Sequence, residues 1–207
     1  MSGFKVVNVL DMAHELSEDE LKSILTNFSS PNKDVETFLK ERALIFAKQG
    51  ISQTHLVFTS YKKSNILCGY FTLANKEFVY KHNSRHKLSN TIFKKLKSYG
   101  HFDSKLKIIR VNAPLIGQIG KNFFEDEYRK LIKGDELLKI ACDKIIEAQR
   151  IIGGKIVYLE CEDISCLKDF YSDNGFVLFG ERNLDLSEQS LFKGKTLLQM
   201  LRISKYS

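Results

Sequence analysis

The order of segments after residue 106 constrains the fold of this chain more than any other feature. A strand-like run over 106–121 is followed by a short basic loop, and Gly134 then opens a long helix that ends at Gly153-Gly154. Apolar residues recur along that helix with the 3.6-residue period of an amphipathic element. Further segments follow: a buried strand over 155–161, a short helix over 165–172, and strands over 176–180 and 196–203. This order predicts a mixed α/β fold in which helices flank a central sheet.

The first half of the chain predicts helices followed by a hairpin. Ser17 and Glu20 have the spacing of a capping box and predict a helix from there to about residue 28. Asp34 is the expected cap of a second helix, and Gly50 stands where a left-handed helix end is expected. Three strands complete the pattern, one over 5–10 and an antiparallel pair over 54–59 and 66–73.

Length and composition favour one domain, 1–207, without metal or membrane segment. The 207 residues are 43% hydrophobic, enough to bury a core without disulfides. No apolar run approaches the ~20 residues of a membrane helix, and the first residues lack the pattern of a signal peptide. The cysteines lie scattered and form no C-x-x-C pair, so we expect core thiols in a cytoplasmic protein: Cys68, Cys142, Cys161 and Cys166.

The positive charge is concentrated in one stretch, residues 76–107. The stretch contains eight Lys and one Arg, and its two acidic residues are Glu77 and Asp103. Its net charge of +7 equals the net charge of the whole chain. Such a patch favours an anionic partner, and a solvated insert is the alternative. Aromatic residues interleaved with these charges are candidates for stacking on nucleic-acid bases: Tyr80, Phe93, Tyr99 and Phe102.

The basic loop before the long helix is a candidate phosphate site. It runs from Arg129 to Gly134 and carries three cationic side chains. Backbone N–H groups at a helix N-terminus, together with the helix dipole, attract anions such as a pyrophosphate. An ordinary basic turn would have the same sequence pattern, so the loop alone does not decide between the two.

With this loop included, the sequence resembles the GNAT superfamily of N-acetyltransferases over nearly its whole length. The family signature Q/R-x-x-G-x-G/A is matched by Arg129 and Gly134, whereas Ile132 replaces the middle glycine. Three further segments resemble a subgroup that includes the toxin acetyltransferases of toxin–antitoxin pairs: 67–73 (L-C-G-Y-F-T-L), 113–119 (A-P-L-I-G-Q-I) and 170–176 (F-Y-S-D-N-G-F). In the second of these Gln118 replaces the usual Arg, and Asn122 replaces an Asp that usually closes the strand.

The resemblance implies a GNAT fold: a mixed, mostly antiparallel sheet of about six to seven strands, flanked by helices and carrying the basic insert at about 76–107. It implies that acetyl-CoA is the co-substrate and that no metal takes part. The pantetheine arm is expected along the backbone of Ile119, Gly120 and Lys121, with Ser165 as a further contact. The residues expected around the pyrophosphate are Arg129, Lys130, Ile132, Lys133, Gly134 and Asp135.

The resemblance also assigns the chemistry. The acceptor amine attacks the thioester directly, and Tyr171 is the candidate general acid for the departing thiolate. A phenol has a reference pKa near ~10, comparable with that of a thiol. The residues suggest no firm general base. The carboxylates of 125–127 could act through water or form a solvated turn, and an α-amine with a pKa of ~8 can react without a protein base.

Two functions from different classes remain open at this point. One is an acetyl-CoA-dependent N-acetyltransferase whose acceptor is an aminoacyl-tRNA, a protein or a small amine. The other is a GNAT-fold binding module that recognises nucleic acid or a protein through residues 76–107, which Ile132 in the glycine position favours. Expected partners are acetyl-CoA and an amine acceptor, with tRNA bound through the basic insert and a homodimer as open possibilities.

Overall fold

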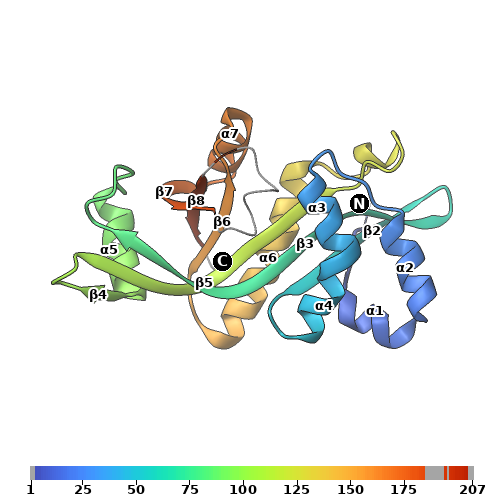
Figure 1. The fold of residues 1–207 in the computed structure, drawn as a ribbon, viewed down its shortest axis with the longest axis horizontal. Coiled ribbons are helices and arrows are strands. Elements are labelled where there is room, and N and C mark those ends of the chain that lie inside the picture. Colours follow the sequence, from blue (N-terminus) through green and yellow to red (C-terminus); the bar gives the residue numbers. More distant parts are fainter. Residues whose placement is uncertain (1–2, 185–193, 195, 205–207) are drawn as a thin grey trace. The chain divides into compact units, whose positions relative to one another are not determined.

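The computed structural model of the chain describes residues 3–184, 194 and 196–204, and it divides into two compact units (Figure 1). The first unit combines Met1–Ala74 with Gly117–Ala141, and the second combines Asn75–Ile116 with Cys142–Ser207. The long strands β3 (Ser64–Lys81) and β5 (Ile108–Lys121) and the helix α6 (Gly134–Ile152) each contribute to both units.

Strands of the first unit follow the order β1-β2-β3-β5. β1 (Lys5–Asn8) and β2 (Gln53–Tyr61) pair antiparallel, and so do β2 and β3. The expected hairpin is confirmed, and its two turn residues, Lys62 and Lys63, both have positive φ angles of 47° and 67°. Two left-handed residues in succession form the turn whose twist matches that of the paired strands.

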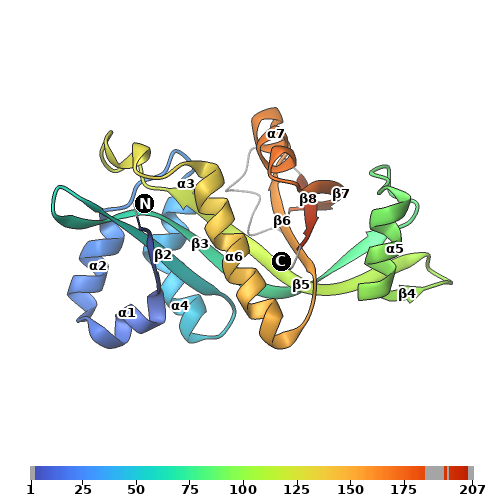
Figure 2. The ribbon, with the colours of Figure 1, turned by 180° about the vertical axis from the view of Figure 1, so that it is seen from behind.

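Helices of the first unit lie on both faces of this sheet. The first face carries α1 (Val9–Glu15), α2 (Glu18–Thr26), α3 (Lys33–Thr37), a π-helical turn (Phe38–Arg42) and α4 (Ala43–Lys48). Figures 1 and 2 show α3 and α4 on one side of β2 and β3 and the first turns of α6 on the other. Their apolar faces form a core that includes Val9, Leu21, Leu25, Phe28, Phe38, Leu39, Leu56 and Tyr70.

The second unit contains the remaining strands, in the order β5-β6-β8-β7 with β4 (His101–Asp103) paired to β5. β6 (Ile156–Glu162) pairs with β5 in parallel and with β8 (Thr196–Ile203) antiparallel, and β7 (Val177–Asn183) lies antiparallel to β8. The helix α7 (Ser165–Asp173) precedes β7. The described sheet is therefore mixed and mostly antiparallel, as predicted, with eight strands rather than six to seven.

The basic stretch supplies the additional strand. Its first residues continue β3 as far as Lys81, α5 (Asn90–Tyr99) follows, and β4 then returns against β5. Tyr80 is buried with 2% of its surface exposed, so it belongs to the core and is not available for stacking on a base. Tyr99 is exposed, whereas the Lys97 ammonium lies 4.3 Å from the centre of the Phe102 ring.

Local capping interactions confirm two of the predicted helix boundaries and shift two others. The capping box of Ser17 and Glu20 is present, and Gly50 has the expected positive φ of 69°. The strand predicted over 5–10 ends at Asn8, because the Asn8 side chain accepts a hydrogen bond from Leu10 N and starts α1 there. The predicted cap at Asp34 is wrong, since Asn32 accepts from the Asp34 N–H and caps α3.

The four cysteines are free thiols in the structure, three of them buried and Cys166 exposed. In the described part of the chain, no group of three or more His, Cys, Asp or Glu side chains has a metal-binding arrangement. No helix among the described residues is long and apolar enough to cross a membrane.

Candidate active site

The end of β5 carries the segment predicted to pair with the pantetheine arm. The strand ends with Ile119, Gly120 and Lys121, which belong to the first unit. Gly120 is required by close packing, because a Cβ atom there would lie 2.5 Å from Val35 Cγ1. On the neighbouring strand, a Cβ at Gly69 would lie 2.9 Å from the Gly120 oxygen and 3.0 Å from Leu137 Cδ2. The two strands and the first turns of α6 therefore pack through glycine.

The predicted phosphate loop lies in the same unit and joins a short 3₁₀ turn (Tyr128–Lys130) to α6. Gly134 opens α6 as predicted. Arg129, Lys130, Lys133 and Asp135 are exposed, and Arg129 lies 3.7 Å from Asp126 in a surface ion pair. The loop thus presents its cations to solvent at the N-terminus of a long helix.

Ile132, which replaces the middle glycine of the signature, has 1% of its surface exposed. Its side chain is buried and does not occupy the exposed side of the loop. The replacement therefore adds core packing beneath the loop while the loop's backbone N–H groups remain in place.

One of those N–H groups already has a partner. The backbone N–H of Lys133 donates to Glu136 Oε2 at 2.8 Å, which is the reciprocal half of a capping box. An anion that uses this N–H has to displace the Glu136 carboxylate, which is exposed.

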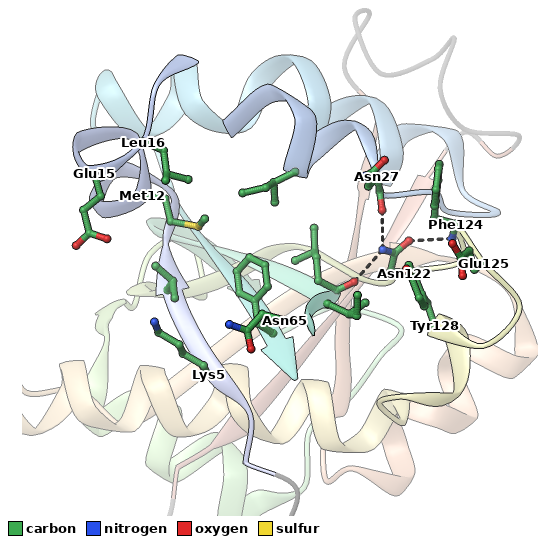
Figure 3. A pocket seen from close by; sticks show the side chains of 15 residues that line it. Lys5, Met12, Glu15, Leu16, Asn27, Asn65, Asn122, Phe124, Glu125 and Tyr128 are labelled. Carbon is green, nitrogen blue, oxygen red and sulfur yellow. Dashed lines mark hydrogen bonds between the residues drawn. The ribbon is translucent and has the colours of Figure 1, made fainter. Parts of the chain in front are cut away.

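Asn122, where the related proteins usually have Asp, is fully buried and forms four side-chain hydrogen bonds. Its amide donates to the carbonyl oxygens of Asn27 and Leu67, both at 2.8 Å, and its oxygen accepts from the N–H group of Phe124 (Figure 3). The same oxygen also accepts from the N–H group of Ser29. A carboxylate has no N–H donor for the two carbonyl oxygens. Asn is therefore the residue that these partners require.

A cavity of about 410 Å³ lies next to Asn122, within the first unit (Figure 3). Its volume is in the range of small-molecule sites. Apolar side chains from β1, α1, α2 and β3 line much of it, and Glu125 and Tyr128 close it on the side of the phosphate loop. The residues lining it include Met12, Leu16, Ile24, Phe58, Asn27 and Asn65.

Tyr171 and Ser165, the other two predicted site residues, share the helix α7 of the second unit. Ser165 is exposed in its first turn. Tyr171 is 7% exposed and packs edge-on against Phe170 and Phe176. Burial, with a smaller effect from the Cys161 thiol, raises the pKa of the Tyr171 phenol well above its usual value, so it stays protonated at neutral pH.

Sequence reasoning missed a pair of polar residues in the first unit. Gln118 Nε2, on β5, donates to Asp34 Oδ2, on α3, at 2.6 Å. Asp34 is buried, with 7% of its surface exposed. The contact joins positions 84 residues apart, and its one signal in the sequence is that Gln118 departs from the usual Arg.

Comparison with known proteins identifies the fold. No protein-family model matches the sequence, and no curated protein is similar to it in sequence. Among solved structures, a Tyr-to-Phe mutant of KacT has a TM-score of 0.59 and 16% identity, covering 96% of this chain and 94% of KacT. AtaT complexed with acetyl-methionyl-tRNAfMet has a TM-score of 0.59 and 12% identity, covering 95% and 94%. AtaTR bound with AcCoA has a TM-score of 0.53 and 13% identity, covering 94% and 91%.

KacT and AtaT are GNAT-type toxin acetyltransferases of toxin–antitoxin systems. At these identities the likeness concerns the arrangement of the backbone. Together with the mixed sheet and the glycine-opened helix α6, it shows that this chain has the GNAT fold found in those toxins.

Proposed function

We propose that the protein is an acetyl-CoA-dependent N-acetyltransferase. The observation that carries the proposal is the packing of two segments in one unit of a GNAT-fold chain. The end of β5 and the first turn of α6, which follows the loop, are joined by the close contacts of Gly69 with Gly120 and Leu137. The backbone of Ile119–Lys121 would pair with the pantetheine arm, and the N–H groups from Lys130 to Asp135 would hold the pyrophosphate. The proposal treats the chain as one GNAT domain with a basic insert at 76–107.

In the proposed mechanism, the acceptor amine attacks the thioester carbon directly. The C–N bond forms as the C–S bond breaks, and the protein supplies orientation and proton transfer. Tyr171 would give its phenolic proton to the leaving thiolate, and Ser165 would contact the cofactor arm. The structures of KacT and AtaT solved as Tyr-to-Phe mutants support a functional tyrosine in proteins of this fold.

The acceptor that we propose is the amino group of an aminoacyl-tRNA. Support comes from the AtaT complex with acetyl-methionyl-tRNAfMet and from the excess charge of +7 within residues 76–107. The exposed aromatic Tyr99 lies on α5 within that stretch. The phosphates of the tRNA would bind the lysines of α5 by an electrostatic, salt-dependent interaction. A cytoplasmic location follows from this acceptor, and an assembly as a homodimer is part of the proposal.

The test is calorimetry with acetyl-CoA followed by an acetyl-transfer assay on charged bulk tRNA. Acetyl-CoA at roughly 100 times its Kd should stabilise the folded protein by about 2.7 kcal/mol. No heat of binding and no shift in Tm at millimolar acetyl-CoA would exclude the enzyme.

A second candidate is a GNAT-fold binding module that recognises nucleic acid through the basic stretch without chemistry. It is favoured by the hydrogen bond from the Lys133 N–H to Glu136, which occupies a donor that the pyrophosphate would use. The same calorimetry separates the two, because the module binds tRNA but not acetyl-CoA.

A further inference from the structure

Asp34 is a buried carboxylate without a cationic partner in the described chain. Buried carboxylates are almost always paired, because removing a charge from water is expensive. Glu36, two residues further along the chain, follows this rule. Its Oε1 atom lies 2.8 Å from Lys40 Nζ and 3.4 Å from Lys33 Nζ. The Lys40 ammonium lowers the pKa of Glu36 to about 2. Asp34 takes part in none of the ion pairs that the described residues form.

The neutral amide of Gln118 hydrogen-bonds one carboxylate oxygen of Asp34, and the other oxygen has no hydrogen-bond partner among the described residues. Gln118 donates to Oδ2, and no other described side chain hydrogen-bonds the carboxylate. In the described chain, the buried side-chain atoms that lack a partner are Ser52 Oγ and Gln149 Oε1. The second Asp34 oxygen is not one of them, so part of its surface is accessible to solvent.

Asp34 lies beside the segment proposed to bind the pantetheine arm. Side chains alternate along a strand, so Gln118 and Gly120 project to the same face of β5. α3 packs on that face, with Val35 against Gly120 and Asp34 hydrogen-bonded to Gln118. Asp34 therefore lies against the residue that directly precedes Ile119, where the proposed cofactor segment begins.

We propose that Asp34 binds the acceptor amine and takes its proton during acetyl transfer. The inference rests on the proposed acetyltransferase function and adds to it the group that receives the acceptor. The amine nitrogen donates a hydrogen bond to the open oxygen and attacks the thioester carbon. As the C–N bond forms and the C–S bond breaks, one amine proton passes to Asp34, and the thiolate takes a proton from the general acid. Asp34 then releases its proton to solvent, and the general acid regains one from solvent.

The chemical class of the acceptor follows from this site. A primary amine with a pKa of ~8 is partly protonated at neutral pH: its ammonium form pairs with the carboxylate, and it attacks the thioester after losing this extra proton to solvent. Gln118 is a positioning residue in this scheme, because it fixes the carboxylate and carries no charge.

Other titratable groups around Asp34 leave its proton transfer undisturbed. From β3, Tyr70 faces Asp34, and its hydroxyl donates to the Val35 oxygen at 2.5 Å. Burial first and the Asp34 charge second raise the pKa of Tyr70, so it stays a neutral phenol. β5 contributes the neutral Gln118 amide, and on the helix of Asp34 itself Lys33 and Glu36 are paired with each other.

Asp34→Asn tests the inference, because Asn keeps an oxygen for Gln118 and cannot take a proton. With charged bulk tRNA as acceptor, kcat/KM should fall by roughly 100-fold or more, the range of a lost general base, while the Kd for acetyl-CoA changes less than about threefold. At each pH through the range in which the amine loses its own proton, around its pKa of ~8, kcat/KM of the variant should stay below that of the wild type. Glu36→Gln, which alters a structural carboxylate two residues away, is the control and should keep the wild-type kcat/KM.

Gln118→Ala is a second variant that tests the inference if Asp34→Asn does not fold. It leaves the carboxylate in place, so we expect a smaller loss of kcat/KM, about tenfold. Asp34→Asn with the wild-type kcat/KM, or with a loss no larger than that of Gln118→Ala, would overturn the role of Asp34. A wild-type protein that neither binds acetyl-CoA nor acetylates charged tRNA would instead overturn the proposed function, and this inference with it.

Discussion

Glu136 accepts a hydrogen bond from the backbone N–H of Lys133, so a carboxylate occupies the N-terminus of the helix where the proposed pyrophosphate would bind. Both the carboxylate and the phosphates are attracted by the same helix end. The side chain therefore stabilises the helix when the site is empty and competes with the ligand when it binds.

Replacing Glu136 with Gln should tighten acetyl-CoA binding. The amide oxygen still accepts from Lys133, while the negative charge opposing the phosphates is removed. A charge in the first turn of a helix contributes about 0.3–1 kcal/mol, so the Kd measured by calorimetry should fall about two- to fivefold. Glu147→Gln, which changes a carboxylate of α6 paired with Lys144, should leave the Kd unchanged. Weaker binding by the Glu136 variant would place the phosphates elsewhere.

Tyr171→Phe should lower turnover and leave acetyl-CoA affinity nearly unchanged. The substitution removes one hydroxyl and keeps the ring contacts with Phe170 and Phe176. Loss of a general acid typically lowers the rate by roughly 10²–10⁴-fold. Because burial raises the pKa of this phenol, the wild-type rate should not decline through deprotonation of Tyr171 up to a pH of about 10. Normal turnover, with chemistry shown to limit the rate, would assign Tyr171 to the core.

Asn122→Asp should destabilise the fold strongly although it changes one atom. The carboxylate loses both donors and faces two buried carbonyl oxygens, so we expect a loss of about 3 kcal/mol or more in urea unfolding at pH 7. Burial without donors raises the pKa of the new carboxyl above ~3.9, so the stability present at low pH should be lost as the pH rises. The exposed Asn65→Asp is the control, and a loss as small as in that variant would contradict the network.

Glu36 should contribute stability that depends on pH. Lys40 lowers its pKa to about 2 from its usual value of 4.5, so the contribution is present above about 4.5 and is lost as the pH falls towards 2. After discounting for solvent, we expect Glu36→Gln to lower the free energy of unfolding by about 1–2 kcal/mol at pH 7. Chemical denaturation of both proteins at pH 7 and pH 3 measures this difference, which should shrink at the lower pH. A constant difference would show that Glu36 acts through packing alone.

Neutralising Lys94, Lys95 and Lys97 together should weaken tRNA binding without changing the Kd for acetyl-CoA. All three lie on α5 in the basic stretch. Each phosphate contact contributes about 0.7–0.9 to the slope of log affinity against log salt, so the slope should flatten in the triple Ala variant. Equal tRNA binding by the variant and the wild type at low salt would favour a peptide or small-amine acceptor.

Local signals in the sequence predicted much of this architecture. The capping box of Ser17 and Glu20, the stop at Gly50 and the start of α6 at Gly134 depend on neighbouring residues, and all three are present. The continuation of β3 to Lys81 could not be read from the sequence, because charged residues there conceal the strand pattern and its partners lie far along the chain. Asp34 has the local sequence pattern of a helix cap. Its side chain instead accepts a hydrogen bond from Gln118 on β5, a partner 84 residues away that the local pattern does not indicate.

Departures from the GNAT signature were visible in the sequence, but their structural meaning was not. A buried Ile132 and an Asn122 that donates to two carbonyl oxygens are properties of the packed unit. Sequence reasoning could identify these positions as unusual. Only the hydrogen-bond partners and the burial explain why the replacements are compatible with the fold.

The glycine contact between β3, β5 and α6 joins the elements that carry the two proposed anchoring segments into one packed body. Leu137 follows Gly134 by less than one helical turn, and its methyl groups lie against Gly69, which also meets the Gly120 carbonyl. A ligand held at both ends by such a body gains a chelate effect: once the pyrophosphate is bound, the pantetheine arm meets its strand at a high effective concentration. Either half of the ligand alone should therefore bind far more weakly than the intact molecule.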